Sequence, residues 1–194
     1  MSRKPSSADF AAAGAAPLAA ITALAALDSL DLAEGASVLV VGANGGTGSF
    51  FVQLAATAGA NVIAVALPED ADYLGGLGAN EVIDRNADVH AEVHERFPEG
   101  VDAILDLASR APDPSSLKEG GRLASPLGAA GEGPGRVNLM ASPTTSNLER
   151  LAQLIDAGTL RVPIQHTYPL DQAGSSLEAF ANTHKQGKVA IAIA

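Results

Sequence analysis

The chain has 194 residues, 47% of them hydrophobic, which is enough for one ordinary domain with a sizeable buried core. Acidic residues outnumber basic ones 22 to 12, so the formal charge is −10. This charge argues against nucleic acid and anionic membranes as partners, because both would repel the chain. There is no cysteine, which excludes disulfides, thiolate nucleophiles and cysteine-ligated zinc.

The N-terminal stretch predicts a packed helix. Arg3 and Lys4 precede an uncharged run over residues 10–27, an order that superficially resembles a targeting signal. The run is mostly alanine and therefore too weakly apolar for a membrane span, and Pro17 suits a first helical turn. The stripe that such a helix would bury comprises Leu18, Ile21, Leu24 and Ala25. We expect a cytoplasmic protein, with a targeting segment as the alternative.

Short apolar strands and helices alternate through the rest of the chain. Strands are predicted at residues 37–41, 61–66, 81–84, 101–107, 122–125 and 137–140, and helices at 50–58, 70–77, 87–96 and 147–157. A strand at 162–166, a helix at 171–184 and a strand at 188–193 follow. This alternation predicts an α/β fold of Rossmann type. Its doubly wound parallel sheet would have the first strand near the centre and helices on both faces.

One glycine-rich segment carries the chemical signal. Residues 38–48 read VLVVGANGGTG, directly after the first strand and at the start of a helix. Binding a pyrophosphate requires exposed backbone N–H groups, a positive helix end and no side chains in the way. Gly45 would let the backbone approach the phosphates, and Gly48 would let the helix pack tightly on the strand. The alternative is a merely tight strand-to-helix turn.

The end of the second strand bears on which dinucleotide would bind. An acidic residue there would contact the ribose hydroxyls of NAD, but the position is Ala66. Residues 67–70 contain no Lys or Arg to neutralise the 2′-phosphate of NADP. The nearest basic residue is Arg85, after the third strand, which is a candidate contact for the 2′-phosphate or the adenine. A solvated loop arginine is the alternative.

An ordered set of segments resembles the cofactor domain of the medium-chain dehydrogenase family, in particular its zinc-free quinone oxidoreductases. The matching segments are residues 16–27, 32–35, 38–48, 77–84, 100–106, 120–123, 157–161, 168–170 and 187–189. The resemblance implies a Rossmann fold and an NAD(P)-dependent transfer of hydride to a quinone or an activated alkene or carbonyl. It favours NADP(H), without excluding NAD(H), and it implies no zinc.

The resemblance also implies which residues contact the cofactor. In the glycine-rich segment these are Ala43, Asn44, Gly45, Gly46, Thr47 and Gly48. Further contacts are implied where the fourth and fifth strands end, at Leu107, Ala108, Ser125 and Pro126. Thr22 matches a threonine that approaches the nicotinamide in such enzymes. No catalytic residue is assigned.

The sequence departs from the family pattern in two ways. The basic residue usually found after the second strand is missing, which puts the NADP(H) preference in doubt. The N-terminal substrate-binding domain of these enzymes, about a hundred residues long, is also absent. We therefore expect residues 1–35 to form a linking helix, 36–162 the dinucleotide-binding domain, and 163–194 a remnant of the substrate domain.

Other candidate residues have simpler explanations. His90 and His94 have a metal-ligand spacing, but no third ligand is evident, so a solvated helix face is favoured. His166 and Tyr168 could donate a proton, although ordinary packing is the safer interpretation. The carboxylates that flank the fourth strand, Asp102 and Asp106, are expected to cap turns and not to act as an acid–base pair.

Two other functions remain open. The spacing of glycines in residues 42–48 also fits a non-catalytic NADP sensor of the atypical short-chain type, although such proteins begin at this motif. An inactive, truncated cofactor domain is the third possibility. The expected partners are a dinucleotide and a small quinone or enone, with no nucleic acid or membrane. An edge strand at residues 137–140 could pair with its counterpart in a homodimer.

Overall fold

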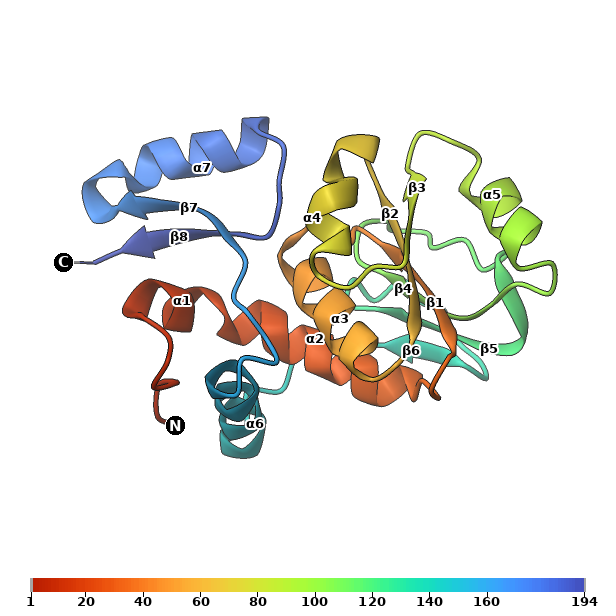
Figure 1. Ribbon diagram of the computed structural model, residues 1–194, viewed down its shortest axis with the longest axis horizontal. Helices are drawn as coiled ribbons and strands as arrows, with labels where there is room; N and C mark the ends of the chain where they lie inside the picture. The colour runs from red at the N-terminus through yellow and green to blue at the C-terminus, as the bar shows by residue number, and fades with distance from the viewer. Residues whose placement is uncertain (1, 194) are drawn as a thin grey trace.

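The computed structural model describes residues 2–193 and contains a six-stranded sheet with a smaller two-stranded sheet beside it (Figure 1). The strands of the large sheet are β1 (Ser37–Val41), β2 (Asn61–Ala66), β3 (Glu81–Asp84), β4 (Val101–Asp106), β5 (Leu117–Ser125) and β6 (Arg136–Asn138). They run parallel in the order β3-β2-β1-β4-β5-β6. The doubly wound Rossmann order, with the first strand near the centre, is thus confirmed.

Helices cover both faces of this sheet, as predicted. The helices nearest the sheet are α2 (Pro17–Leu30), α3 (Gly46–Thr57), α4 (Ala71–Gly75) and α5 (Val89–Arg96). Helix α6 (Thr145–Asp156) packs on α2, and α1 (Phe10–Ala15) lies beside the smaller sheet. Successive residues of a strand face opposite sides, so Val38 and Val40 join the core under α2 and α3. Leu39, between them, joins a second core that Val93 of α5 and Ala130, in the loop after β5, complete.

The N-terminal helix is more deeply buried than one apolar stripe would make it. Eight residues of α2 are buried, including Ile21, Leu24 and Thr22. The prediction for Leu18 was wrong, because this side chain is 75% exposed. Leu18 lies in the first turn of α2, where it lines a cavity instead of the core. Among the described residues, none of the helices is long and apolar enough to cross a membrane.

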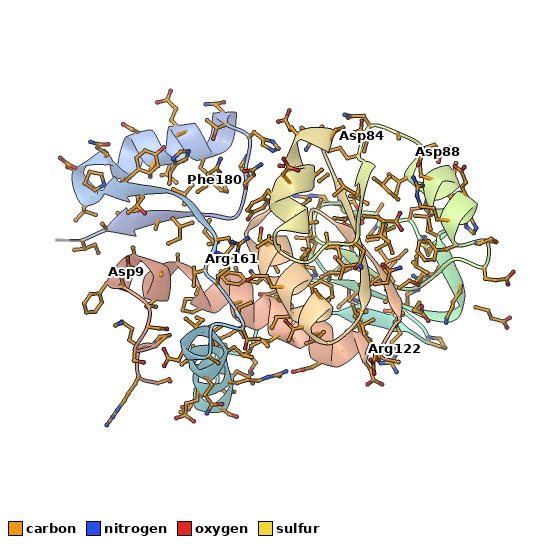
Figure 2. The ribbon with its side chains drawn as sticks, in the orientation of Figure 1. Asp9, Asp84, Asp88, Arg122, Arg161 and Phe180 are labelled. Atoms are coloured by element: carbon orange, nitrogen blue, oxygen red, sulfur yellow. The ribbon has the colours of Figure 1, made fainter. Side chains whose placement is uncertain are left out.

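Several element boundaries differ from the predicted ones by a few residues. The predicted helix at 70–77 begins as a 3₁₀ turn, η1 (Pro68–Asp70), before α4. Helix α5 starts two residues late because the Asp88 side chain accepts a hydrogen bond from Ala91 N and caps it (Figure 2). Strand β5 begins five residues early, at Leu117, and its pairing with β4 shifts register between Leu117 and Arg122.

The C-terminal segment forms its own small unit. Strands β7 (Ile164–Pro169) and β8 (Lys188–Ala192) pair in parallel, connected by η2 (Leu170–Gln172) and α7 (Ala173–Asn182). Helix α1 packs against β8, so the two ends of the chain lie side by side (Figure 1). Between α7 and β8 the chain returns to the large sheet, where Gly187 N donates to Asn44 O at 2.8 Å.

Candidate functional site

The turn after β1 requires glycine for steric reasons. Gly42 has φ +82°, a left-handed conformation that side chains disfavour. A Cβ there would also lie 3.4 Å from the Leu107 Cβ and 3.5 Å from the Ala108 Cβ. Gly45 N donates to Gly42 O at 3.2 Å, which closes the turn and leaves Gly45 as the N-cap of α3. The chain therefore reverses tightly from β1 into α3 beside the end of β4.

The first turn of α3 packs directly on this reversal. A Cβ at Gly48 would overlap Gly42 O and lie 2.6 Å from Ala43 O. At Gly45, by contrast, a Cβ would meet only Gly42 O, at 3.4 Å. Because the first helical turn has no intrahelical acceptors for its N–H groups, those of Gly46, Thr47 and Gly48 form a positive helix end suited to an anion.

A cavity of about 620 Å³ opens at the carboxyl ends of the central strands. Its lining residues are Gly42, Asn44, Gly45, Leu67, Glu69, Arg85, Leu107, Ala108, Ala181, Asn182, Thr183, His184 and Lys185. The sheet order reverses between β1 and β4, which is where ligands bind in open α/β sheets. The structure thus brings together at one cavity the glycine turn, the residues after β4 and Arg85.

Charged groups of both signs line this cavity. Arg85 is exposed after β3, and its backbone N donates to the buried Ala66 O at 2.8 Å. Glu69 has a side chain that is 66% exposed, and its carboxylate lies 3.8 Å from His184 Nε2. A phosphorylated ligand in this cavity would therefore meet the cations Arg85 and Lys185 and the carboxylate of Glu69.

Other predicted contact residues make bonds within the protein. The Asn44 side chain donates to Asp70 Oδ2 and to Lys185 O, both at 3.0 Å. Thr22 Oγ1 donates to Leu18 O of its own helix at 2.8 Å. The Ser125 side chain is fully buried, and its Oγ accepts from Leu127 N across the turn that contains Pro126.

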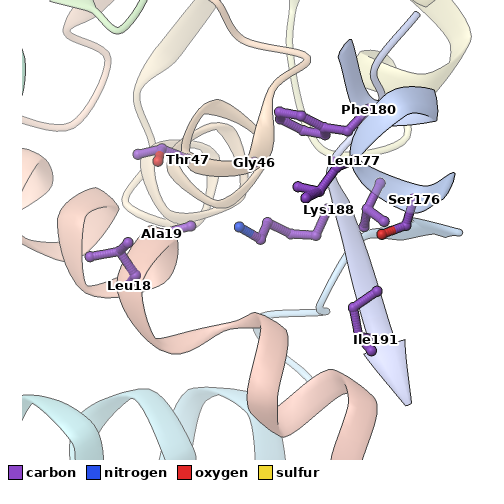
Figure 3. Close-up of a pocket in the computed structure, with 11 residues that line it drawn as sticks. Leu18, Ala19, Gly46, Thr47, Ser176, Leu177, Phe180, Lys188 and Ile191 are labelled. Carbon is purple, nitrogen blue, oxygen red and sulfur yellow. The ribbon is translucent and has the colours of Figure 1, made fainter. Parts of the chain in front are cut away.

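A second cavity, of about 370 Å³, adjoins the start of α3 on its other side. Lys188 extends into it from β8 toward Ala19, passing Gly46 (Figure 3). A Cβ at Gly46 would lie 2.6 Å from Lys188 Cδ, so the lysine stem packs on the glycine backbone. The cavity is otherwise mostly apolar, with Leu18 and Phe180 among its lining residues.

The residue that follows Gly48 connects α3 to α4. Ser49 Oγ is 2.8 Å from the Tyr73 hydroxyl and donates to Gly45 O at 2.8 Å. Burial raises the pKa of the Tyr73 hydroxyl, against the opposing hydrogen bond with Ser49. Tyr73 therefore stays protonated at neutral pH and serves as a hydrogen-bonding partner for the first turn of α3.

The carboxylates that flank β4 hold turns and strand ends, as predicted. Asp106 accepts from Ala108 N at 2.9 Å and from Ser109 N at 2.8 Å. Asp102 accepts from Ser37 N and Oγ and from Lys118 Nζ. Partial burial opposes ionisation of Asp102, but these hydrogen bonds lower its pKa to about 2.

The histidine pair on α5 is engaged by neighbouring groups. The rings of His90 and His94 are 4.3 Å apart, and His94 contacts two backbone carbonyl oxygens, those of Pro98 and Ser115. Across residues 2–193 no three His, Asp or Glu side chains come close enough to hold a metal ion. The residues present do not fit a zinc centre.

Sequence reasoning missed three residues at the site. Glu69 and Lys188 line the two cavities, and Asp70 is fully buried behind the glycine turn. Asp70 follows a strand in a polar stretch and carries no local signal of burial. Its partners lie far along the chain, so only the tertiary structure reveals them.

The comparisons with known proteins decide the family. A family model described as zinc-binding dehydrogenase matches residues 77–191, which is more than half of the chain. The chain belongs to the zinc-binding dehydrogenase family. The resemblance to medium-chain, quinone-oxidoreductase-like proteins is thereby confirmed. The family name mentions zinc, whereas the described residues of this member do not assemble the ligands for it.

Relatives and solved structures agree with this assignment. The NADPH-dependent alkenal/one oxidoreductase of Arabidopsis thaliana chloroplasts is 27% identical over 97% of this chain and 48% of its own length. The quinone oxidoreductase from Coxiella burnetii has a TM-score of 0.80 and 28% identity over 90% of this chain and 58% of its own. An NAD-dependent alcohol dehydrogenase has a TM-score of 0.86 and 26% identity over 100% and 62%. The chain spans about half the length of the curated relatives it matches.

Proposed function

We propose that this chain is the cofactor-binding part of an oxidoreductase that reduces a quinone, or an alkene activated by a carbonyl group. We further propose that NADP(H) is the preferred dinucleotide and that the reaction needs no zinc. The observation that carries the proposal is the glycine turn, with the positive end of α3, at the mouth of a cavity of about 620 Å³ at the sheet's switch point. The similarity to a quinone oxidoreductase and to an alkenal/one oxidoreductase supports the substrate class.

The residues at this site have separate tasks in the proposed function. Bound here, a nicotinamide dinucleotide would supply the hydride. The amides of Gly46, Thr47 and Gly48 would hold its phosphates, and the missing side chain at Gly45 would let the backbone come close. Arg85 would neutralise a 2′-phosphate, since it lines the same cavity after β3.

The other half of the active site is proposed to lie outside these residues. We infer that residues 36–162 are the dinucleotide-binding domain and that residues 163–194 belong to a second, substrate-binding domain. The separate sheet of β7 and β8 supports this division. A cytoplasmic location and a homodimer formed through the edge strand β6 stay predictions from the sequence.

Titration calorimetry of NADPH and NADH into the purified chain tests the proposal. We expect a dissociation constant near the micromolar range for one of them, about −8 kcal/mol. Gly45→Val should abolish this binding, because the valine side chain would occupy the path of the phosphates. A Cβ at Gly45 meets only Gly42 O, at 3.4 Å, so the fold should tolerate the change. Gly75→Ala is the matched control, since a Cβ there meets nothing within 4 Å.

Three outcomes distinguish the possible functions. Binding together with reduction of a quinone or enone supports the oxidoreductase. Tight binding by the whole protein without turnover favours a dinucleotide sensor. If neither nucleotide binds below about 1 mM, near −4 kcal/mol, the proposed cofactor site is wrong for this chain.

A further inference from the structure

A buried carboxylate joins the glycine turn to the C-terminal segment. Asp70, in η1 after β2, is 0% exposed. Its Oδ1 accepts from His184 Nε2 at 2.7 Å and from Gln186 Nε2 at 2.9 Å. Its Oδ2 accepts from Asn44 Nδ2 at 3.0 Å and, more weakly, from Leu67 N at 3.4 Å. Both carboxylate oxygens are therefore satisfied by groups that the fold brings from three parts of the chain.

This arrangement makes the carboxylate and its partners mutually dependent. A buried carboxylate is tolerated only when its oxygens are hydrogen-bonded. Within residues 2–193, Asp70 has no Lys or Arg partner, and His184 is its one ion-pair contact. Two of the three side chains that donate to Asp70 belong to His184 and Gln186. Asp70 therefore needs the C-terminal segment in place, and its hydrogen bonds hold that segment there.

The segment also bonds to the glycine turn directly. Asn44 Nδ2 donates to Lys185 O at 3.0 Å, and Asn44 O accepts from Gly187 N at 2.8 Å. Figure 1 shows the connection between α7 and β8 running back beside α4 and α3. Asn44 is thus hydrogen-bonded both to Asp70 and to the backbone of Lys185 and Gly187.

The held segment is one wall of the cavity. Residues 181–185 line the space of about 620 Å³ together with Leu67, Arg85 and the residues that follow β4. If the segment moved away, the cavity would be left open on that side. A ligand there would then lose its contacts with residues 181–185. It would also contact a glycine turn that the hydrogen bonds of Asp70 and Asn44 no longer fix in place.

We propose that Asp70 is a positioning residue, which holds residues 181–187 against the glycine turn as a wall of the dinucleotide site. The inference rests on the proposed function, because it assumes that the cavity takes a dinucleotide. Asp70 itself lies behind the turn and is fully covered. Its effect on the cofactor is therefore exerted through Asn44 and the C-terminal segment.

Hydrogen exchange and calorimetry on Asp70→Asn test this role. The asparagine keeps the size of the side chain but turns an amide toward other donors. We expect faster exchange at the amides of Gly187 and Lys188, which donate to Asn44 O and Pro163 O. We also expect about a tenfold weaker affinity for the preferred nucleotide, or about 1.4 kcal/mol. Asp72→Asn, at an exposed position in α4, is the matched control.

Two histidine variants separate positioning from general damage to the fold. His184→Gln keeps a donor for Asp70 and should preserve slow exchange at residue 187, whereas His184→Leu removes the donor and should accelerate it. The pair also replaces Asp70→Asn if that variant fails to fold. Equal exchange in the two histidine variants would overturn the proposal.

Failure of the proposal and failure of the proposed function give different results. If the wild-type chain binds neither nucleotide, the proposed function is wrong and so is the wall's role in cofactor binding. If the wild type binds and Asp70→Asn binds equally well, with or without faster exchange, only the positioning role is overturned. Faster exchange together with weaker binding supports both.

Discussion

Gly48→Ala should destabilise the fold at the place where α3 meets the glycine turn. The added Cβ would overlap Gly42 O and lie 2.6 Å from Ala43 O. Both atoms belong to the backbone of a tight turn, so neither can rotate away as a side chain would. Overpacking of this kind costs about 3 kcal/mol at the upper end of the usual range. For a chain of this size, that cost corresponds to a fall in Tm of roughly 6–12 °C.

Thermal unfolding followed by circular dichroism measures this effect. Two controls make the comparison specific, namely Gly45→Ala, three residues earlier, and Gly75→Ala in α4. A Cβ at Gly45 has a single contact, at 3.4 Å, and one at Gly75 meets nothing within 4 Å. Gly75→Ala should keep the wild-type Tm or raise it slightly, and Gly45→Ala should lower Tm by much less than Gly48→Ala does, because alanine is only a poorer N-cap than glycine. A Tm for Gly48→Ala within about 1 °C of wild type would refute the steric account of the turn.

Three further predictions concern charge. The pKa of Asp102 is about 2 in the fold against an ordinary 3.8. The ionised carboxylate therefore stabilises the folded protein fully above pH 3.8, and this contribution is lost as the pH falls through 2. Because the Asp102 side chain is 32% exposed, Asp102→Asn should lower the free energy of unfolding by only about 1 kcal/mol at pH 7. The variant's unfolding free energy should also depend less on pH in the acid range, which urea unfolding from pH 7 to 2 measures. Arg85→Gln should weaken the affinity for NADPH about tenfold or more in calorimetry and leave the affinity for NADH unchanged. Glu69→Gln should strengthen the affinity for NADPH by about two- to fivefold. If either variant changed the affinities for NADPH and NADH equally, a contact with the 2′-phosphate would be excluded.

The sheet could be predicted from the sequence because its signals are local. The apolar strands at 37–41, 61–66 and 81–84 have the bounds that the pattern gives. The first two are buried along nearly their whole length, whereas the edge strand at 81–84 buries only Ile83. The glycine turn is equally readable, because the positive φ of Gly42 and the close packing at Gly48 are steric demands within one strand–turn–helix unit.

Other features depend on contacts between distant parts of the chain. Leu18 has an apolar side chain at helical spacing, yet it faces a cavity because the first turn of α2 lies beside β8 and α7. Asp70 is buried by residues more than a hundred positions away, and Lys188 reaches Gly46 from the last strand. No periodicity within a short window could reveal such long-range partners.

Amide chemical-shift mapping by NMR, with NADPH and then NADH added to the 19.5 kDa chain, tests the central claim most directly. If the cavity at the sheet's switch point binds the dinucleotide, the largest shifts should fall at Gly42, Gly45 and Arg85 and after β4, at Leu107 and Ala108, which line that cavity and not the Lys188 cavity. Shifts centred on the Lys188 cavity alone, or no shifts with either nucleotide at millimolar concentration, about −4 kcal/mol, would contradict it.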